Sequence, residues 1–74
     1  MSQTTVDARG KSCPLPIVLL AKAARQATSG AVIVIQADDR AFPADIAAWC
    51  ERTKHELISL QGKDGSFEAH VRKP

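Results

Sequence analysis

A continuous apolar segment near the middle of this 74-residue chain, residues 31–37 (AVIVIQA), constrains the fold more than any other feature. An unbroken β-branched run of this kind is typical of a central strand. It follows a helical pattern over residues 14–28, which is preceded by alternating residues 4–8 that indicate a short edge strand. A strand, a helix and a strand in this order predict a parallel pair with a right-handed crossover. The carboxyl ends of both strands should therefore meet at one edge of the sheet, where open α/β sheets place their sites.

The rest of the chain predicts one more helix and a hairpin. The helix should span residues 43–54, and the hairpin strands should span 56–61 and 66–72 around a turn at 62–65. The order β-α-β-α-β-β predicts a two-layer α/β sandwich, with a mixed four-stranded sheet and both helices on one face. Residues 1–74 should form a single domain, too small to enclose a large substrate pocket.

Helical periodicity separates the faces of the two helices. The sheet-facing residues of the first helix are predicted to be Ile17, Leu20, Ala21, Ala24 and Ala27, and those of the second Ile46, Trp49, Cys50 and Thr53. Cys50 should therefore be buried and structural, and Asp45 should point elsewhere. His55, at the end of the second helix, is expected to interact with the helix dipole.

Composition excludes several classes of function. The net charge is +2 with the basic residues scattered, and the three aromatic residues are too few for a base-stacking platform, so direct nucleic-acid binding is not expected. The N-terminus lacks a signal-peptide pattern and no segment is long enough to span a membrane, so we expect a soluble cytoplasmic protein with no membrane partner. The spacing of two cysteines and two histidines suggests no metal site, no cofactor is expected, and both cysteines should be free thiols.

The segment from Arg9 to Pro16 (RGKSCPLP) carries the candidate chemistry. Cys13 stands where a strand pattern gives way to a helical one, so we expect a helix N-terminus to favour its thiolate form. Cys13 could be the N-cap, or the helix could begin nearer Pro16 and leave the thiol on a rigid lip ahead of it. Burial as a small apolar residue is the alternative.

Residues near Cys13 suggest how the site is supported. Asp7 is expected to hold the loop by accepting backbone N–H bonds. Asp38 and Asp39 should emerge near the same loop, where they could cap the next helix or contact a basic partner, and a capping and turn role is the favoured interpretation. An apolar group beside Cys13, bordered by basic residues, predicts a docking surface. Its members are Leu15, Val18 and Leu19, with Lys22 and Arg25 at the border.

The motif residues 7–16, D-x-x-G-x-x-C-P-x-P, resemble the signature of the TusA/SirA sulfur-carrier proteins. Further similar residues occur at 37–39, at 45–46, at Cys50 and at 55–57, so the resemblance covers nearly the whole chain. It implies the same two-layer fold, which is shared with the C-terminal domain of bacterial translation initiation factor three.

The resemblance implies a sulfurtransferase that carries sulfur as a persulfide on Cys13, its catalytic residue. The donor would be a cysteine desulfurase or a rhodanese-like protein, and the acceptor a DsrE/TusD-like or other sulfur-accepting protein. Arg9 and Lys11 would steady the anion, and Leu15 with Leu19 would set the docking register. The full set of expected binding residues is Arg9, Gly10, Lys11, Pro14, Leu15, Pro16, Leu19 and Lys22.

One residue departs from the pattern of the branch that serves transfer-RNA thiolation. That branch carries an acidic residue between the two prolines, where this chain has Leu15. The acceptor pathway could therefore be tRNA thiolation, molybdenum cofactor supply or sulfur oxidation. Two other classes compete with the sulfur relay: a non-enzymatic regulatory or RNA-associated module that has no use for Cys13, and a redox protein that pairs Cys13 with Cys50.

Overall fold

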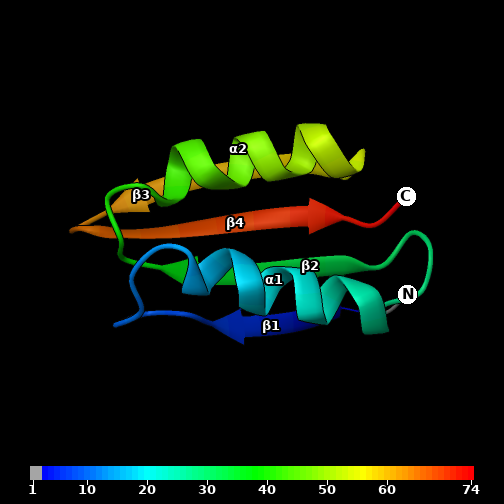
Figure 1. The fold of residues 1–74 in the computed structure, drawn as a ribbon, viewed down its shortest axis with the longest axis horizontal. Coiled ribbons are helices and arrows are strands. Elements are labelled where there is room, and N and C mark those ends of the chain that lie inside the picture. Colours follow the sequence, from blue (N-terminus) through cyan, green and yellow to red (C-terminus); the bar gives the residue numbers. More distant parts are fainter. Residues whose placement is uncertain (1–2) are drawn as a thin grey trace.

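The computed structural model describes residues 3–74, and its six elements follow the predicted order. In chain order they are β1 (Gln3–Asp7), α1 (Leu15–Gln26), β2 (Val32–Ala37), α2 (Phe42–Thr53), β3 (Glu56–Lys63) and β4 (Ser66–Arg72). Both helices lie on the same side of the sheet (Figure 1). The predicted two-layer architecture is confirmed, and the helix boundaries differ from prediction by one or two residues.

The sheet has the strand order β1-β2-β4-β3. β1 pairs in parallel with β2, with Thr4 opposite Ile33, whereas β4 runs antiparallel to both of its neighbours. β1 therefore lies at an edge and β2 is central, as the alternating and continuous apolar patterns predict. A register shift between Leu57 and Ser59 marks an irregularity in the other edge strand, β3.

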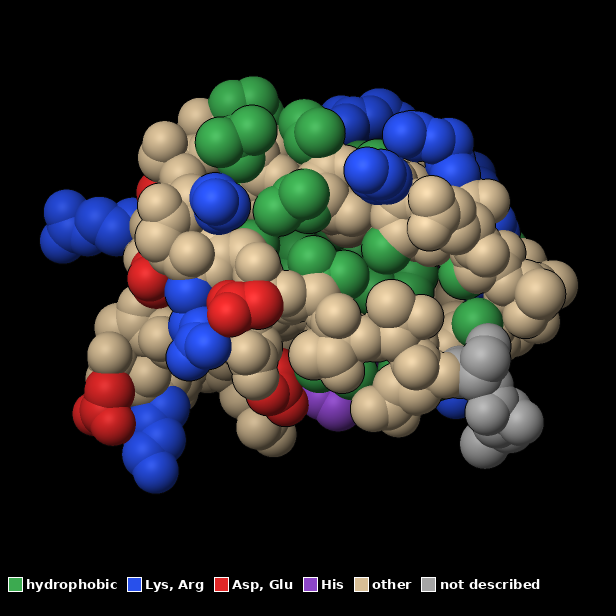
Figure 2. All heavy atoms as spheres, turned by 90° about the horizontal axis from the view of Figure 1, so that it is seen from below, with side chains coloured by type: hydrophobic (Ala, Val, Ile, Leu, Met, Phe, Trp, Pro, Cys, Tyr) green, Lys and Arg blue, Asp and Glu red, His purple; other side chains and the backbone are tan. Residues whose placement is uncertain are grey.

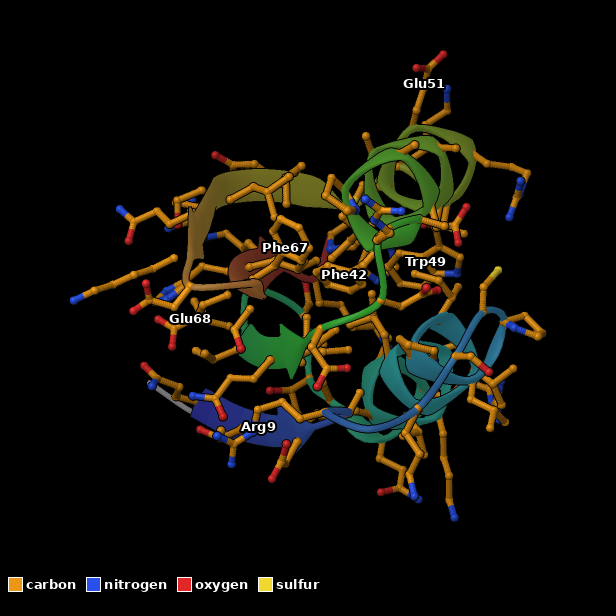
Figure 3. The ribbon with its side chains drawn as sticks, turned by 90° about the vertical axis from the view of Figure 1, so that its left-hand side faces the viewer. Arg9, Phe42, Trp49, Glu51, Phe67 and Glu68 are labelled. Atoms are coloured by element: carbon orange, nitrogen blue, oxygen red, sulfur yellow. The ribbon has the colours of Figure 1, made fainter. Side chains whose placement is uncertain are left out.

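The core fills the space between the helices and one face of the sheet. Its largest fully buried side chains are Phe42, Leu20, Ile33, Ile35, Ile46, Val71 and Pro16. Each large apolar side chain stabilises the fold by roughly 1.5–3 kcal/mol when it is fully buried. Phe67 faces Phe42 with the ring centroids 6.3 Å apart, which joins the end of the hairpin to the start of α2 (Figure 3).

The hairpin between β3 and β4 turns through Asp64 and Gly65. Both residues have positive φ, 54° and 81°, as a two-residue type I′ turn requires. The hairpin is confirmed, and its turn is tighter than the four-residue loop predicted from the sequence.

The parallel pairing of β1 and β2 decides where the loops gather. The β1–α1 and β2–α2 connections and the first turns of both helices lie at one end of the molecule, on the left in Figure 1. Among residues 3–74, no helix has the length and apolar character needed to cross a membrane.

Candidate functional site

Cys13 lies in the β1–α1 loop at this end, and its side chain is exposed. The N-cap of α1 is Pro14, so Cys13 stands one position ahead of the N-cap, and a cis peptide bond joins it to Pro14. This arrangement matches the rigid lip and not the N-cap alternative. Leu15 donates its backbone N–H to the carbonyl of Ser12, which removes one of the amides expected to face the sulfur.

Two aspartates at the end of β2 hold the Cys13 loop from across the sheet. The Gly10 N–H donates to both carboxylate oxygens of Asp38, at 3.0 and 3.1 Å, and the Cys13 N–H donates to Asp39 at 2.8 Å. Gly10 has φ +80°, a conformation that glycine adopts without strain. The predicted proximity of these segments is confirmed. The predicted turn is also found, since the Phe42 N–H donates to the Asp39 carbonyl at 3.0 Å, but the predicted cap is not, because Ala41 is the N-cap of α2 and no side chain caps it.

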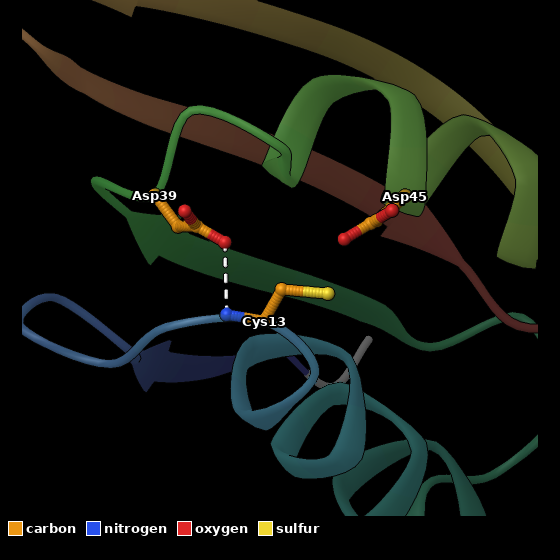
Figure 4. Close-up of side chains that lie close together, drawn as sticks. All are labelled: Cys13, Asp39 and Asp45. Atoms are coloured by element: carbon orange, nitrogen blue, oxygen red, sulfur yellow. Dashed lines mark hydrogen bonds between the residues drawn. The ribbon is translucent and has the colours of Figure 1, made fainter.

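Asp45 approaches the sulfur from the first turn of α2 (Figure 4). One oxygen of Asp45, one of Asp39 and the Cys13 Sγ all lie within 4.8 Å of one another. Asp45 lies off the buried stripe of α2, as predicted, but the sequence did not place it beside the sulfur. The start of α2 lies at the same sheet edge as the Cys13 loop, and this consequence of the parallel topology was the available signal.

The electrostatics of the thiol are opposite to prediction. Its pKa is raised above the ordinary cysteine value, first by hydrogen bonding to the Asp45 carboxylate, then by desolvation and by the negative charges of Asp45 and Asp39. The expected shift toward thiolate fails for a physical reason. Pro14 and Pro16 have no N–H to offer the sulfur, and a nearby carboxylate outweighs a helix terminus whose effect is about 0.3–1 kcal/mol.

Arg9 pairs with an acidic residue at the end of β1. Its side chain forms a bidentate pair with Asp7, with Nε to Oδ1 at 2.9 Å and Nη2 to Oδ2 at 3.0 Å, and it lies beside β1 (Figure 3). Asp7 also accepts the backbone N–H of Arg9 at 3.1 Å, as predicted for a loop-holding carboxylate. The Arg9 guanidinium is thus engaged by Asp7, its anion-steadying role stays a prediction, and exposed Lys11 is the nearest cation along the loop.

The exposure expected of the docking surface is found for part of it, and docking itself stays a prediction. Leu15 and Val18 are 48% and 53% exposed, and hydrophobic side chains bordered by basic ones form a patch on this side of the molecule (Figure 2). Lys22 is exposed nearby on α1. Leu19, however, is half-buried against the core, and Pro16 is fully buried, so neither presents the free contact surface expected of it.

The second cysteine and the histidine that follows α2 belong to the structural interior. Cys50 is buried, as predicted, and burial raises its pKa to about 11. His55 packs on Trp49 with ring centroids 4.5 Å apart, and burial lowers its pKa. Its Nδ1 lies 3.3 Å from the carbonyl oxygen of Thr53, the last residue of α2, so the expected role of His55 at the end of this helix stays a prediction.

The sulfur and the two carboxylates could approach a metal ion geometrically. Three ligands of this kind do not complete the four-coordinate set of a structural zinc site, so we assign no metal here. A groove of about 660 Å³ on the uncovered face of the sheet includes Gln36, Phe67 and Glu68 in its lining, which does not include Cys13. Glu68 projects from that face (Figure 3).

A family model described as "Sulfurtransferase TusA" matches residues 4–73. The chain belongs to the TusA sulfurtransferase family. A protein of Neisseria meningitidis named "Putative sulfur carrier protein" is 39% identical over 72 residues, which cover 97% of each chain. A protein of Aquifex aeolicus with the same name is 32% identical over 69 residues, 93% of this chain and 35% of that one.

The fold of this TusA family member also has a solved counterpart. The crystal structure of a SirA-like protein from Desulfitobacterium hafniense superposes with a TM-score of 0.82 at 24% identity, covering 93% of this chain and 95% of that one. The resemblance read from the motif is thus confirmed at the level of family and fold. Membership of the TusA family indicates a role in sulfur transfer.

Proposed function

We propose that the protein is a sulfur relay in which Cys13 carries sulfane sulfur as a persulfide. The observation that supports this most is the exposed Cys13 sulfur at the tip of an anchored loop, while the other cysteine, Cys50, is buried. Attack on a sulfur–sulfur bond needs an accessible thiolate and no enclosing pocket, which suits a domain of this size.

The loading step conserves atoms and electrons. The Cys13 thiolate bonds to the outer sulfur of a donor persulfide, the donor's S–S bond breaks, and the thiol proton of Cys13 ends on the donor's departing sulfur. An acceptor thiolate then attacks the outer sulfur of Cys13–S–SH and restores the free cysteine. The persulfide is a reversible state of cysteine, so no resolving thiol is needed.

A cysteine desulfurase or a rhodanese-like protein is the proposed donor, and a DsrE/TusD-like protein is a candidate acceptor. Leu15 and Val18 would contact these partners, since they form exposed apolar surface on the helix that follows Cys13. Lys22 would contribute a charge at the edge of this contact, and Lys11 lies on the loop itself.

The test incubates the protein with a cysteine desulfurase and free cysteine, then examines the Cys13 peptide by mass spectrometry for one added sulfur. The wild type and Cys50→Ser should gain the sulfur, and Cys13→Ser should not. Leu15→Gln and Val18→Gln, which remove apolar surface without adding charge, should slow loading while leaving small-molecule alkylation of Cys13 unchanged. Failure of several donors to load a thiol that iodoacetamide alkylates would contradict the proposal.

A further inference from the structure

One carboxylate at the site, that of Asp45, takes part in none of the ion pairs or helix caps of the described residues. Asp45 is half-buried in the first turn of α2, yet no side chain caps that helix. Three ion pairs join residues within the described range 3–74, and none of them includes Asp45. Its carboxylate is instead directed at the Cys13 sulfur (Figure 4). Asp39 differs, because its Oδ2 is already occupied by the Cys13 N–H.

Packing fixes this direction. The neighbouring residue Ile46 is fully buried, as is Phe42 at the start of the helix, so α2 cannot rotate without exposing core side chains. Asp45, about 100° round the helix from Ile46, is thereby held toward the β1–α1 loop. The loop is held from its own side by the Asp39 contact at 2.8 Å. The Asp45 carboxylate and the Cys13 loop are therefore held in a fixed relative position.

We propose that Asp45 is a positioning residue for Cys13: in the free protein it retains the thiol proton and so restrains the nucleophile. The assignment of this role within sulfur transfer rests on the proposed function. A carboxylate that accepts a hydrogen bond from a thiol and places a negative charge beside it favours the protonated form. The raised pKa of Cys13, for which Asp45 is the first cause, agrees with this geometry.

Other charged groups lie on the elements around the same sulfur, and of these only Asp39 contributes to its raised pKa. Those on the surrounding loops and helix α1 are Arg9, Lys11, Asp38, Asp39, Arg40 and Lys22. Arg9 is paired with Asp7, and Asp38 is bonded to Gly10. Asp39 acts in the same sense as Asp45 but also anchors the loop. Asp45→Asn is therefore the substitution that removes the restraint while keeping the loop anchors.

The physics of thiolates gives this substitution a distinctive signature. Lowering the pKa by one unit raises the thiolate fraction about tenfold at pH values well below it. The more acidic thiolate is intrinsically less nucleophilic, by about threefold per unit for a Brønsted slope of 0.4–0.5. The rate of alkylation should therefore rise about threefold per unit near neutral pH and fall about threefold on the alkaline plateau. The profiles of the two proteins should cross.

The experiment measures the rate of Cys13 alkylation by iodoacetamide from about pH 6 to about pH 11, quantified on the Cys13 peptide. Asp45→Asn should shift the inflection to lower pH and cross the wild-type curve. Asp45→Glu, which keeps the charge, should lie nearer the wild type. Glu51→Gln is the matched control, since it removes a charge from the outer side of the same helix (Figure 3) and should leave the profile unchanged.

An unchanged inflection in Asp45→Asn, in a variant whose circular dichroism matches the wild type, would overturn the proposal. A rate change of equal size at every pH would also overturn it, because that result reports altered access alone. The assay uses no sulfur donor. A failure of sulfur loading therefore contradicts the relay and leaves the Asp45 result intact. An unchanged alkylation profile in Asp45→Asn contradicts the role of Asp45 and leaves the relay intact.

Discussion

Replacing Asp39 with alanine tests whether the end of β2 organises the Cys13 loop. In the native structure the Cys13 N–H donates to Asp39 at 2.8 Å, a hydrogen bond between segments 26 residues apart. The substitution leaves that amide without a protein partner. It also removes one of the two acidic tethers, the other being Asp38 on Gly10.

The magnitude follows from the charge and the exposure of the bond. Hydrogen bonds to charged groups contribute roughly 1.5–3 kcal/mol, and water can replace part of that at an exposed loop. We therefore expect Asp39→Ala to lower the free energy of unfolding by about 1–1.5 kcal/mol. For a domain of this size, each 1 kcal/mol shifts the melting temperature by about 4–8 °C, so a decrease of roughly 5–10 °C should follow. Asp39→Asn keeps an acceptor oxygen and should lose about half as much.

Thermal unfolding by circular dichroism gives the stability change, and amide hydrogen exchange by NMR gives the local one. The Cys13 amide should be protected in the wild type and exchange much faster in Asp39→Ala. Asp64→Asn is the control matched to Asp39→Asn, because it makes the same chemical change in an exposed turn whose φ of 54° asparagine tolerates. If Asp39→Ala and Asp64→Asn shift the melting temperature equally, or if Cys13 protection survives the loss of Asp39, the reasoning is refuted.

Three further predictions concern titration and thiol access. The Asp7 carboxyl has a pKa of about 2, lowered chiefly by its hydrogen bond to Arg9, so its stabilisation should be present above about pH 4 and lost as the pH falls toward 2. Acid unfolding of Asp7→Asn should be correspondingly less steep over that window. His55 has a pKa lowered by burial, so the free energy of unfolding should decrease as the pH falls through about 6.5, where the imidazole of the unfolded chain takes up a proton first. Urea unfolding at pH 8 and pH 6 should show this dependence, and His55→Gln should abolish it. Iodoacetamide at neutral pH should label native protein on Cys13 alone, and label Cys50 as well only after unfolding, as peptide mass spectrometry would show.

The fold was predictable because its signals are local and mutually consistent. The continuous run at 31–37 specifies a central strand, and the strand–helix–strand order then requires a parallel partner. The same topology correctly brought Asp38 and Asp39 to the Cys13 loop. The Asp7–Arg9 pair joins the last residue of β1 to the turn that follows it, and the close spacing of the two opposite charges was the available signal.

The electrostatic state of the site was harder to predict, because it depends on how two helices pack. Periodicity shows that Asp45 is off the buried stripe of α2, but it does not show which neighbour that off-stripe direction meets. The same limit applies to Leu19, which lies between the polar and buried sides of α1 and is half-buried by contacts from the core. The helix N-terminus beside Cys13 predicted a lowered pKa for its thiol. The stronger, opposite effect of the Asp45 carboxylate becomes evident only when α2 is placed in the structure.

The contacts around Cys13 come from three separate stretches of chain: its own loop, the end of β2 and the first turn of α2. None of these stretches could reproduce the sulfur's surroundings in isolation. The reactivity of the Cys13 sulfur therefore reports whether these three segments are packed as in the native structure. If α2 loosened from its neighbours, the reactivity of Cys13 should rise before the secondary structure changed.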